Sequence, residues 1–243
     1  MHLIKVNAIK STNSFAREMF RENNGMPATC ILAKRQLEGR GQRGTVWTSE
    51  EGKNLTFSIV YPKPALSPGR QFVLSAAVAT TVLEVLEKFN LPRLKVKWPN
   101  DILSANLKIG GILIENVISE AKVAASIIGI GLNVNQQNFE GLPQAGSMSG
   151  ICKREFDLED LLQQLLKDLE ARLDHLSEET SEEILKTYKN HLFRRDMPST
   201  FQLPDGTYFT GIICDVTPDG KLMVQKEDDL LQEYDLKEIK LCY

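Results

Sequence analysis

Hydrophobic residues recur at helical spacing in two long stretches of the chain. Residues 66–89 form a long and largely apolar stretch, which predicts a mostly buried helix capped by Ser67, with Pro68 as its first residue. A second stretch begins after Asp157, which we expect to be an N-cap. Its apolar side chains would share one helix face, at positions 158, 161, 162, 165, 166, 169, 173 and 176.

Shorter segments alternate between helix and strand patterns, the order that is typical of an α+β fold. Shorter helices are predicted after a cap at Ser11 and over residues 179–192. Runs of β-branched and other apolar residues bounded by Gly, Pro or polar turns predict strands at residues 2–6, 28–34, 54–61, 93–98, 101–104, 109–118 and 124–135.

The pattern changes near residue 195. From there the chain consists of short strand-like runs separated by two Pro-Asp-Gly sequences, at 204–206 and 218–220, which favour hairpin turns. We therefore expect two domains, a larger α+β domain over residues 1–195 and a small all-β barrel over residues 196–243.

Composition narrows the chemistry that the chain can perform. Its formal net charge is -3, so a site for an anion has to be a local basic cluster. The chain has four widely spaced cysteines and three histidines without ligand spacing, which argues against a zinc site and against Cys-His or Ser-His nucleophile pairs. Neither a membrane-length apolar run nor a secretory signal is present, and the free thiols indicate the cytoplasm.

The segment EGRGQRGTVW, residues 38–47, combines three glycines with two arginines. The amides of Gly39, Gly41 and Gly44 could approach a phosphate closely, and the two arginines could donate forked hydrogen bonds to it. A solvated turn with incidental arginines is equally compatible with the loop alone. The segment lacks the GxxxxGK[ST] pattern of P-loop nucleotide-binding proteins.

Two further motifs place charges beside glycine or proline. In KWPND, residues 97–101, the strand end brings Lys97 and Asp101 together, although a surface salt bridge would look the same. Lys108 precedes a double glycine against which a ligand could lie, but a lysine at such a turn is usually just solvated. Asn133 and Asn135, at the end of an apolar run, either cap a strand or line a pocket.

Five motifs occur in a fixed order: STN (11–13), GRGQRGTVW (39–47), KWPND (97–101), KIGGIL (108–113) and GIGLNVN (129–135). In this combination the chain resembles the biotin protein ligase family, over residues 8–135. The segment GIICDVTPDGKLMV, residues 211–224, is similar to the C-terminal module of that family.

The resemblance implies a mixed β-sheet packed with helices, of the class II synthetase and biotin/lipoate ligase type, followed by an SH3-like β-barrel. Residues 1–195 would then be the catalytic domain that binds biotin and ATP. Family members convert biotin and ATP to biotinyl-5'-AMP and pyrophosphate. They then pass biotin to a lysine of a biotin carboxyl carrier protein, such as that of acetyl-CoA carboxylase. Mg²⁺ would accompany the ATP phosphates, without a protein-held metal site.

Individual roles follow from the same resemblance. The catalytic set would be Arg40, Lys97, Asp101 and Lys108, with Asp101 assisting the acceptor lysine. The biotin-binding set would be Ser11, Thr12, Asn13, Gln36, Gly39, Arg40, Gly41, Gln42, Lys108 and Gly111. The adenylate-binding set would be Arg40, Arg43, Trp47, Asn100, Lys108 and Asn133. Gln42 departs from the arginine that many relatives have there, and its own role is open.

Other functions remain to be weighed. A lipoate ligase or octanoyltransferase shares the fold and the acylation of lysine, but lacks the pairing of the GRGxxG and KWPND motifs. A biotin sensor without catalysis would not need Lys97, Asp101 and Lys108. Some relatives carry a DNA-binding domain ahead of the catalytic part; here STN begins at residue 11, so we expect no operator binding. The sequence leaves the oligomeric state undecided between a monomer and a homodimer, since relatives include both.

Overall fold

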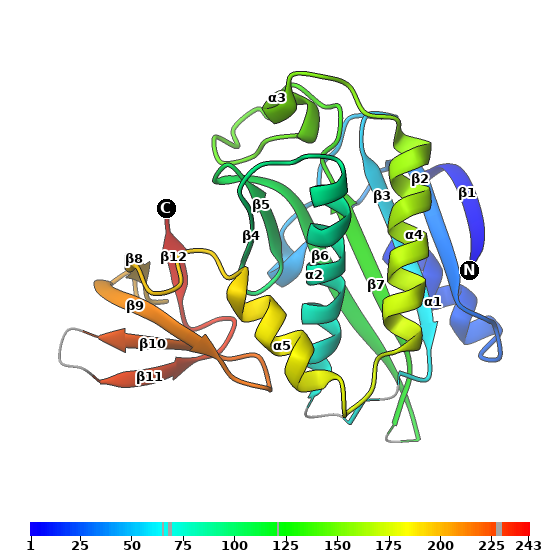
Figure 1. Ribbon diagram of the computed structural model, residues 1–243. Coiled ribbons are helices and arrows are strands. Elements are labelled where there is room, and N and C mark those ends of the chain that lie inside the picture. The colour runs from blue at the N-terminus through cyan, green and yellow to red at the C-terminus, as the bar shows by residue number, and fades with distance from the viewer. Residues whose placement is uncertain (65, 68–69, 121, 227–229) are drawn as a thin grey trace.

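The computed structural model describes residues 1–243 except residues 65, 68–69, 121 and 227–229 and the side chain of Arg43. Seven strands form a mixed sheet in the order β1-β2-β3-β7-β6-β5-β4 (Figure 1), in which β1 and β2 are parallel and the other pairs antiparallel. The strands are β1 (His2–Ile9), β2 (Thr29–Gln36), β3 (Leu55–Pro62), β4 (Leu94–Lys97), β5 (Asp101–Ser104), β6 (Leu107–Ser119) and β7 (Lys122–Leu132).

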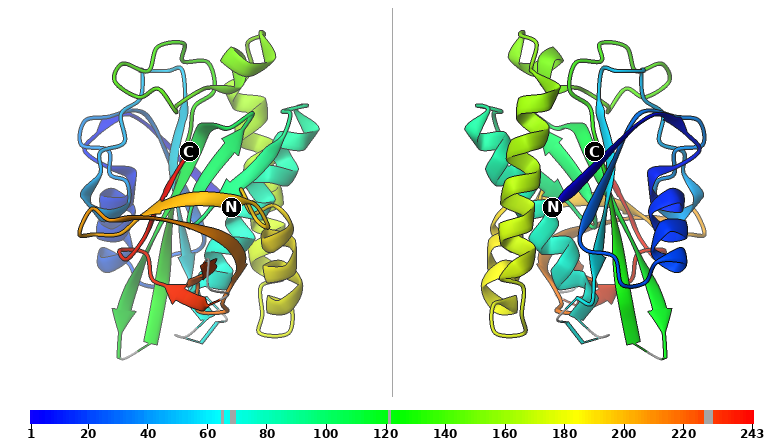
Figure 2. Two further views of the ribbon diagram at one scale, coloured as in Figure 1. Left: turned by 90° about the vertical axis from the view of Figure 1, so that its left-hand side faces the viewer. Right: turned by 90° about the vertical axis from the view of Figure 1, so that its right-hand side faces the viewer.

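Helices cover both faces of this sheet (Figure 2). The helices are α1 (Thr12–Glu22), α2 (Gln71–Lys88), α3 (Met148–Cys152), α4 (Leu158–Asp174) and α5 (Ser181–Asn190). Successive side chains of a strand point to opposite faces. In β7, Ile128 therefore joins the core under α2, whereas Ile127 packs with Ala16 and Phe20 of α1. Burial on both faces accounts for the continuous apolar run that predicted this strand.

Helix α2 is the mostly buried helix that its composition predicts. It contacts both α4 and α5, and twelve of its residues are buried. It begins at Gln71, later than predicted, and the predicted first residue Pro68 lies outside the described part of the chain. The predicted cap of α4 is confirmed, since the Asp157 carboxylate accepts hydrogen bonds from the amides of Glu159 and Asp160.

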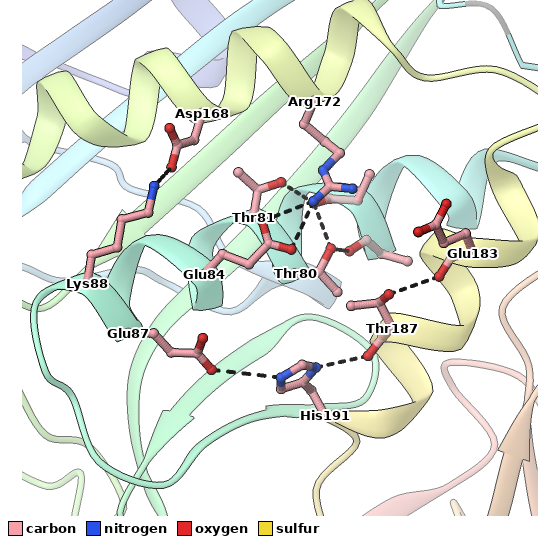
Figure 3. A network of polar contacts seen from close by, with 12 residues as sticks. Thr80, Thr81, Glu84, Glu87, Lys88, Asp168, Arg172, Glu183, Thr187 and His191 are labelled. Carbon is pink, nitrogen blue, oxygen red and sulfur yellow. Dashed lines mark hydrogen bonds and ion pairs between the residues drawn. The ribbon is translucent and has the colours of Figure 1, made fainter.

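Polar contacts join these helices at their solvent edge (Figure 3). Arg172 of α4 donates to both carboxylate oxygens of Glu84 on α2, at 2.9 and 3.0 Å. Lys88 of α2 likewise pairs with Asp168 of α4. Ion pairs this exposed contribute at most about 1 kcal/mol each, so the helices are held mainly by the apolar core.

A second sheet of five antiparallel strands has the order β11-β10-β9-β8-β12. Its strands are β8 (Pro198–Gln202), β9 (Tyr208–Val216), β10 (Leu222–Lys226), β11 (Leu231–Tyr234) and β12 (Lys240–Cys242). The two Pro-Asp-Gly sequences join β8 to β9 and β9 to β10, as predicted, with positive φ angles of 89° at Gly206 and 95° at Gly220. This sheet fits the expected small SH3-like barrel.

The second sheet packs against α5 and the turn between β4 and β5. The indole Nε1 of Trp98 donates to the Gly220 carbonyl at 2.9 Å, and Lys189 of α5 pairs with Asp215 of β9. One apolar core continues from the helices into β8 and β9, through Phe201 and Ile213. No helix among the described residues is long and apolar enough to cross a membrane.

Candidate active site

A cavity of about 680 Å³ opens on the α1 side of the larger sheet. Its position follows from the side chains of β7. Ile127 packs on α1, but the next residues on that face are Gly129 and Gly131, which have no side chains and line the cavity. Strand pairing sets Gly129 between Ser58 and Leu113, and sets Gly111 between Gly131 and Asp101. Residues from four strands therefore meet on the cavity floor.

The two β7 glycines are required by their neighbours. A Cβ atom at Gly129 would lie 2.3 Å from Oδ1 of Asn13, and one at Gly131 would lie 2.4 Å from Cε2 of Trp47. Both distances are far inside van der Waals contact. Glycine at these positions lets α1 and the glycine-rich loop lie directly on the sheet.

The glycine-rich loop is a closed hairpin. The Trp47 amide donates to the Gly39 carbonyl at 2.9 Å, and the Gly41 amide donates to the Thr45 carbonyl at 2.7 Å. In this conformation the Gly41 amide is therefore used within the loop, contrary to the prediction that it is free for an anion. Gly39 lies under Trp47, where a Cβ atom would be 2.3 Å from the Trp47 carbonyl oxygen, and it does not line the cavity.

Asp101 joins the two predicted lysines at one end of the cavity. Its Oδ1 lies 2.6 Å from Nζ of Lys108, and its Oδ2 lies 3.4 Å from Nζ of Lys97. The side chains of Asp101 and Lys97 are only 13% and 18% exposed. Two cations around one carboxylate leave a net positive charge, which favours an anion beside them. The predicted proximity of these residues is confirmed.

A buried polar network lines the opposite end. Gln36 Oε1 accepts hydrogen bonds from the amide and the hydroxyl of Thr12, at 2.8 and 3.1 Å. The Ser58 hydroxyl lies 2.7 Å from Oγ1 of Thr12 and 2.6 Å from Oδ1 of Asn13. The Asn13 amide donates to the Leu113 carbonyl and to Glu115. Asn13 thus has its polar atoms occupied by the protein and holds its neighbours in place.

Arg40 extends from the loop toward the start of α1. Its Nη2 donates to the Ser14 hydroxyl at 2.8 Å and lies 3.6 Å from Oε2 of Glu115. The side chain is 45% exposed and lines the cavity. This placement leaves Arg40 accessible to an anion in the cavity. The side chain of Arg43 lies outside the described residues.

Three comparisons bear on this site. The model of the biotin/lipoate A/B protein ligase family matches residues 6–133. The chain belongs to this family. The match covers more than half of the chain and spans the glycine-rich loop, the Lys97–Asp101–Lys108 cluster and the polar network.

Named relatives agree with the family match. The chain is 37% identical to the bifunctional ligase/repressor BirA of Bacillus spizizenii over 177 residues, 70% of this chain and 53% of that protein. It therefore spans about half the length of that relative. It is 27% identical to the biotin–[acetyl-CoA-carboxylase] ligase of Mycobacterium tuberculosis, over 87% of this chain and 79% of that protein.

Solved structures show the same fold over the whole chain. The biotin protein ligase of Aquifex aeolicus, in complex with biotin and ATP, superposes with a TM-score of 0.81 and 25% identity, covering 99% of this chain and 98% of that one. The expected fold, a mixed sheet with helices followed by a small β module, is confirmed.

Within the ligase fold, two buried polar atoms at the cavity have no hydrogen-bond partner among the described residues. They are Nε1 of Trp47 and Oδ1 of Asn133. Buried polar atoms are normally satisfied, so a ligand with a polar edge fits here. By contrast, the amide of Asn100 donates to the Ile112 carbonyl at 2.6 Å, and in this conformation it secures the turn between β4 and β5.

Other residues of this ligase-fold cavity escaped sequence reasoning. Ser58, which lies behind the cavity wall and bonds Thr12 and Asn13, had one available signal, a hydroxyl within the apolar run LTFSIVY. The cavity wall also includes a segment between β7 and α3, which carries no recognisable motif, and part of the C-terminal module, where sequence reasoning singles out only residues 211–224. These wall residues are Phe139, Gly141, Leu142, Pro143, Gln144, Ala145, Ile213, Leu222, Leu236, Ile239, Lys240, Leu241 and Tyr243.

Tyr243 brings this wall to the charged cluster. Its ring lies 5.3 Å from Nζ of Lys97 and meets the ring of Phe193 edge to face at 5.1 Å. Its backbone oxygen accepts a hydrogen bond from Gln144. Burial, together with the nearby Asp101 carboxylate, raises the pKa of Tyr243 to about 12. Tyr243 lines the cavity, and its phenol stays protonated well above neutral pH.

Proposed function

We propose that this protein is an ATP-dependent, AMP-forming biotin protein ligase. It would join biotin to ATP to give biotinyl-5'-AMP and pyrophosphate, and then transfer biotin to a lysine of a carrier protein, releasing AMP. The observation that carries the proposal is the Lys97–Asp101–Lys108 cluster, which faces one cavity together with the glycine-rich loop and a buried polar network. A relative named biotin–[acetyl-CoA-carboxylase] ligase supports it.

The polar network suits the bicyclic head of biotin. Ser11, Thr12 and Gln36 can exchange hydrogen bonds with a ureido group, and Gly111, where a Cβ atom would be 3.5 Å or more from its neighbours, lets a ring lie on the sheet. Arg40, Gly41, Gln42 and Lys108, which also belong to the predicted biotin-binding set, line the same cavity and would contact the rest of the ligand. Asn13 would act by fixing Thr12 and Ser58, and Gly39 by supporting Trp47.

The charged cluster suits the first reaction step. The biotin carboxylate has to attack the α-phosphate of ATP, and the two anions repel each other. Lys108, Lys97 and Arg40 would hold both groups and stabilise the charge that grows as pyrophosphate leaves. Since both oxygens of Asp101 already face lysines, Mg²⁺ fits best on the phosphates and water. When bound, it would neutralise charge on the departing pyrophosphate.

The second step needs a neutral lysine amine from the carrier. Asp101 lies at the cavity and would accept or relay the proton that this ammonium loses, before the amine attacks the biotinyl carbonyl and AMP departs. The unpartnered polar atoms of Trp47 and Asn133 would bind the adenylate. The predicted adenylate-binding set also includes Arg43 and Asn100. Asn100 would contribute by holding the turn beside Asp101 in place.

Residues 1–195 would form the catalytic domain and residues 196–243 the SH3-like domain, whose Tyr243 and Lys240 reach the cavity. The natural acceptor would be the biotin carboxyl carrier protein of acetyl-CoA carboxylase or a related carboxylase, in the cytoplasm. Gel-shift titration at physiological salt measures whether the protein binds DNA, and light scattering distinguishes a monomer from a homodimer.

A two-step assay tests the proposed function. Pyrophosphate release is measured with ATP and either biotin or lipoate, and label transfer to a purified carrier domain follows. We expect release with biotin and transfer to the carrier lysine. Release with lipoate alone would support the lipoate or octanoate ligase alternative. Tight biotin binding without pyrophosphate release would instead identify a sensor.

A further inference from the structure

Glu115 of β6 lies beside the cavity without lining it, and none of the sequence motifs singled it out. Its two carboxylate oxygens are used differently. Oε1 pairs with Arg17 of α1, while Oε2 accepts a hydrogen bond from Asn13 at 2.8 Å and lies 3.6 Å from Nη2 of Arg40. Strand pairing places Glu115 opposite Ile127, on the face that α1 covers.

These contacts connect three segments that are distant in sequence. Arg40 is attached to the start of α1 at two points, directly through Ser14 and indirectly through Glu115. Backbone hydrogen bonds close the glycine-rich loop from Gly39 to Trp47, so a constraint on Arg40 also constrains Trp47. The carboxylate of Glu115 on β6 therefore links Arg40 of the glycine-rich loop to α1.

The strengths of the two ion pairs differ. Arg17 and Glu115 are 27% and 21% exposed and in close contact, whereas Arg40 is 45% exposed and 3.6 Å away. The inner pair therefore fixes Glu115, and the outer pair is weak enough for an anion to compete for Arg40. Two guanidinium groups around one carboxylate also leave one positive charge for that anion.

We propose that Glu115 is a positioning residue that aims Arg40 at the anionic intermediate and keeps the glycine-rich loop closed over it. This inference rests on the proposed ligase function. Glu115 orients Arg40 in the empty protein, and the adenylate phosphate then takes over part of that guanidinium. Arg17 holds Glu115 in place throughout.

Glu115→Gln tests this role, because glutamine keeps the size of the side chain and an oxygen for Asn13 but removes the charge. We expect biotinyl-AMP to dissociate about three- to fivefold faster, the range for a partly exposed ion pair. In the ligand-free protein, trypsin should cleave the loop between residues 39 and 47 faster. Glu120→Gln, in the exposed turn that follows β6, is the matched control and should leave both rates unchanged.

A double-mutant cycle separates positioning from a general structural effect. Arg40→Ala alone should slow pyrophosphate release and speed dissociation of the adenylate. The double variant that also carries Glu115→Gln should show the same rates as Arg40→Ala. An equal effect of Glu115→Gln with and without Arg40, or wild-type rates of dissociation and cleavage, would overturn the proposal. If the wild type formed no biotinyl-AMP, the proposed ligase function would be wrong. Trypsin cleavage of the ligand-free loop is measured independently of that function, and an unchanged cleavage rate in Glu115→Gln would overturn the anchoring role by itself.

Discussion

Lys108 lies in the cavity beside both the Asp101 carboxylate and the Trp47 ring. Its ammonium pairs with Asp101, lies 5.9 Å from the Trp47 ring centroid, and would be 3.7 Å from a Cβ atom at Gly111. In the proposed reaction it would therefore contact both the biotin carboxylate and the phosphate that the carboxylate attacks. Lys108 is therefore paired with a carboxylate and is not merely a solvated lysine at a turn.

Lys108→Ala should weaken both biotin affinity and activation. A hydrogen bond to a charged group contributes about 1.5–3 kcal/mol, so we expect biotin to bind roughly ten- to a hundredfold more weakly. Titration calorimetry measures the affinity, and pyrophosphate release measures the activation. Lys122→Ala, at the exposed start of β7, is the control. Unchanged biotin binding in Lys108→Ala would count against the assignment.

Gly131→Ala tests the close packing of the indole on β7. The added methyl would lie 2.4 Å from the ring, so Trp47 has to move while the strand itself can remain. We expect weaker binding of ATP and adenylate, with little change in the unfolding temperature. Gly25→Ala, where the nearest atom is 3.8 Å away, is the control. ATP affinity equal to that of wild type would show that this packing is unimportant for the nucleotide.

The short strand β12 positions Tyr243 at the cavity. It pairs with β8 and delivers Tyr243 to the charged end of the cavity, so that the second sheet forms a wall of the site. The ring contacts Lys97, whose ammonium also pairs with Asp101. The position of Lys97 consequently depends on residues from both sheets.

Tyr243→Ala should impair the reaction, and Tyr243→Phe should largely restore it. A cation–π contact at a partly exposed site contributes about 0.5–1 kcal/mol, so a two- to fivefold loss of rate is expected in the alanine variant. Rates of adenylate formation and transfer are measured separately. Tyr208→Ala, an exposed tyrosine of β9, should behave as wild type. If Tyr243→Phe is as slow as Tyr243→Ala, the phenol hydroxyl is the important group.

Stability of the molecule at alkaline pH depends on groups buried in its core. Burial raises the pKa of the Cys30 thiol from 9.0 to about 12, and also raises the pKa of the Tyr188 phenol. In the unfolded chain these groups ionise at lower pH than in the folded protein. Their stabilising contribution is complete below about pH 9 and is lost as pH rises toward 12.

Urea unfolding between pH 8 and pH 11 measures this loss. For Cys30 the free energy of unfolding should fall by about 1.4 kcal/mol per pH unit above pH 9. Cys30→Ala should be less stable at pH 8, because it leaves a small cavity, but should show a shallower decline. Cys152→Ala, whose thiol is nearer the surface, is the control. If the free energy of unfolding fell equally steeply with pH in wild type and in Cys30→Ala, the Cys30 thiol would not be the source of the alkaline loss of stability.

Part of the candidate site could be predicted because it is local in sequence. Lys97 and Asp101 are four residues apart on either side of one turn, and Lys108 follows on the next strand of the same hairpin. Their proximity needs little more than correct strands. Ser58 and Glu115 could not be found in this way, since their partners lie 45 to 102 residues away.

The sequence alone determined the types and approximate limits of the main elements, the two hairpin turns and the family, because side-chain periodicity, turn residues and ordered motifs are properties of neighbouring residues. Only the tertiary structure decided which polar atoms are satisfied within the protein, why Gly129 and Gly131 lack side chains, and how Tyr243 reaches Lys97. Those features depend on distances between segments that meet only after folding, and no local pattern encodes them.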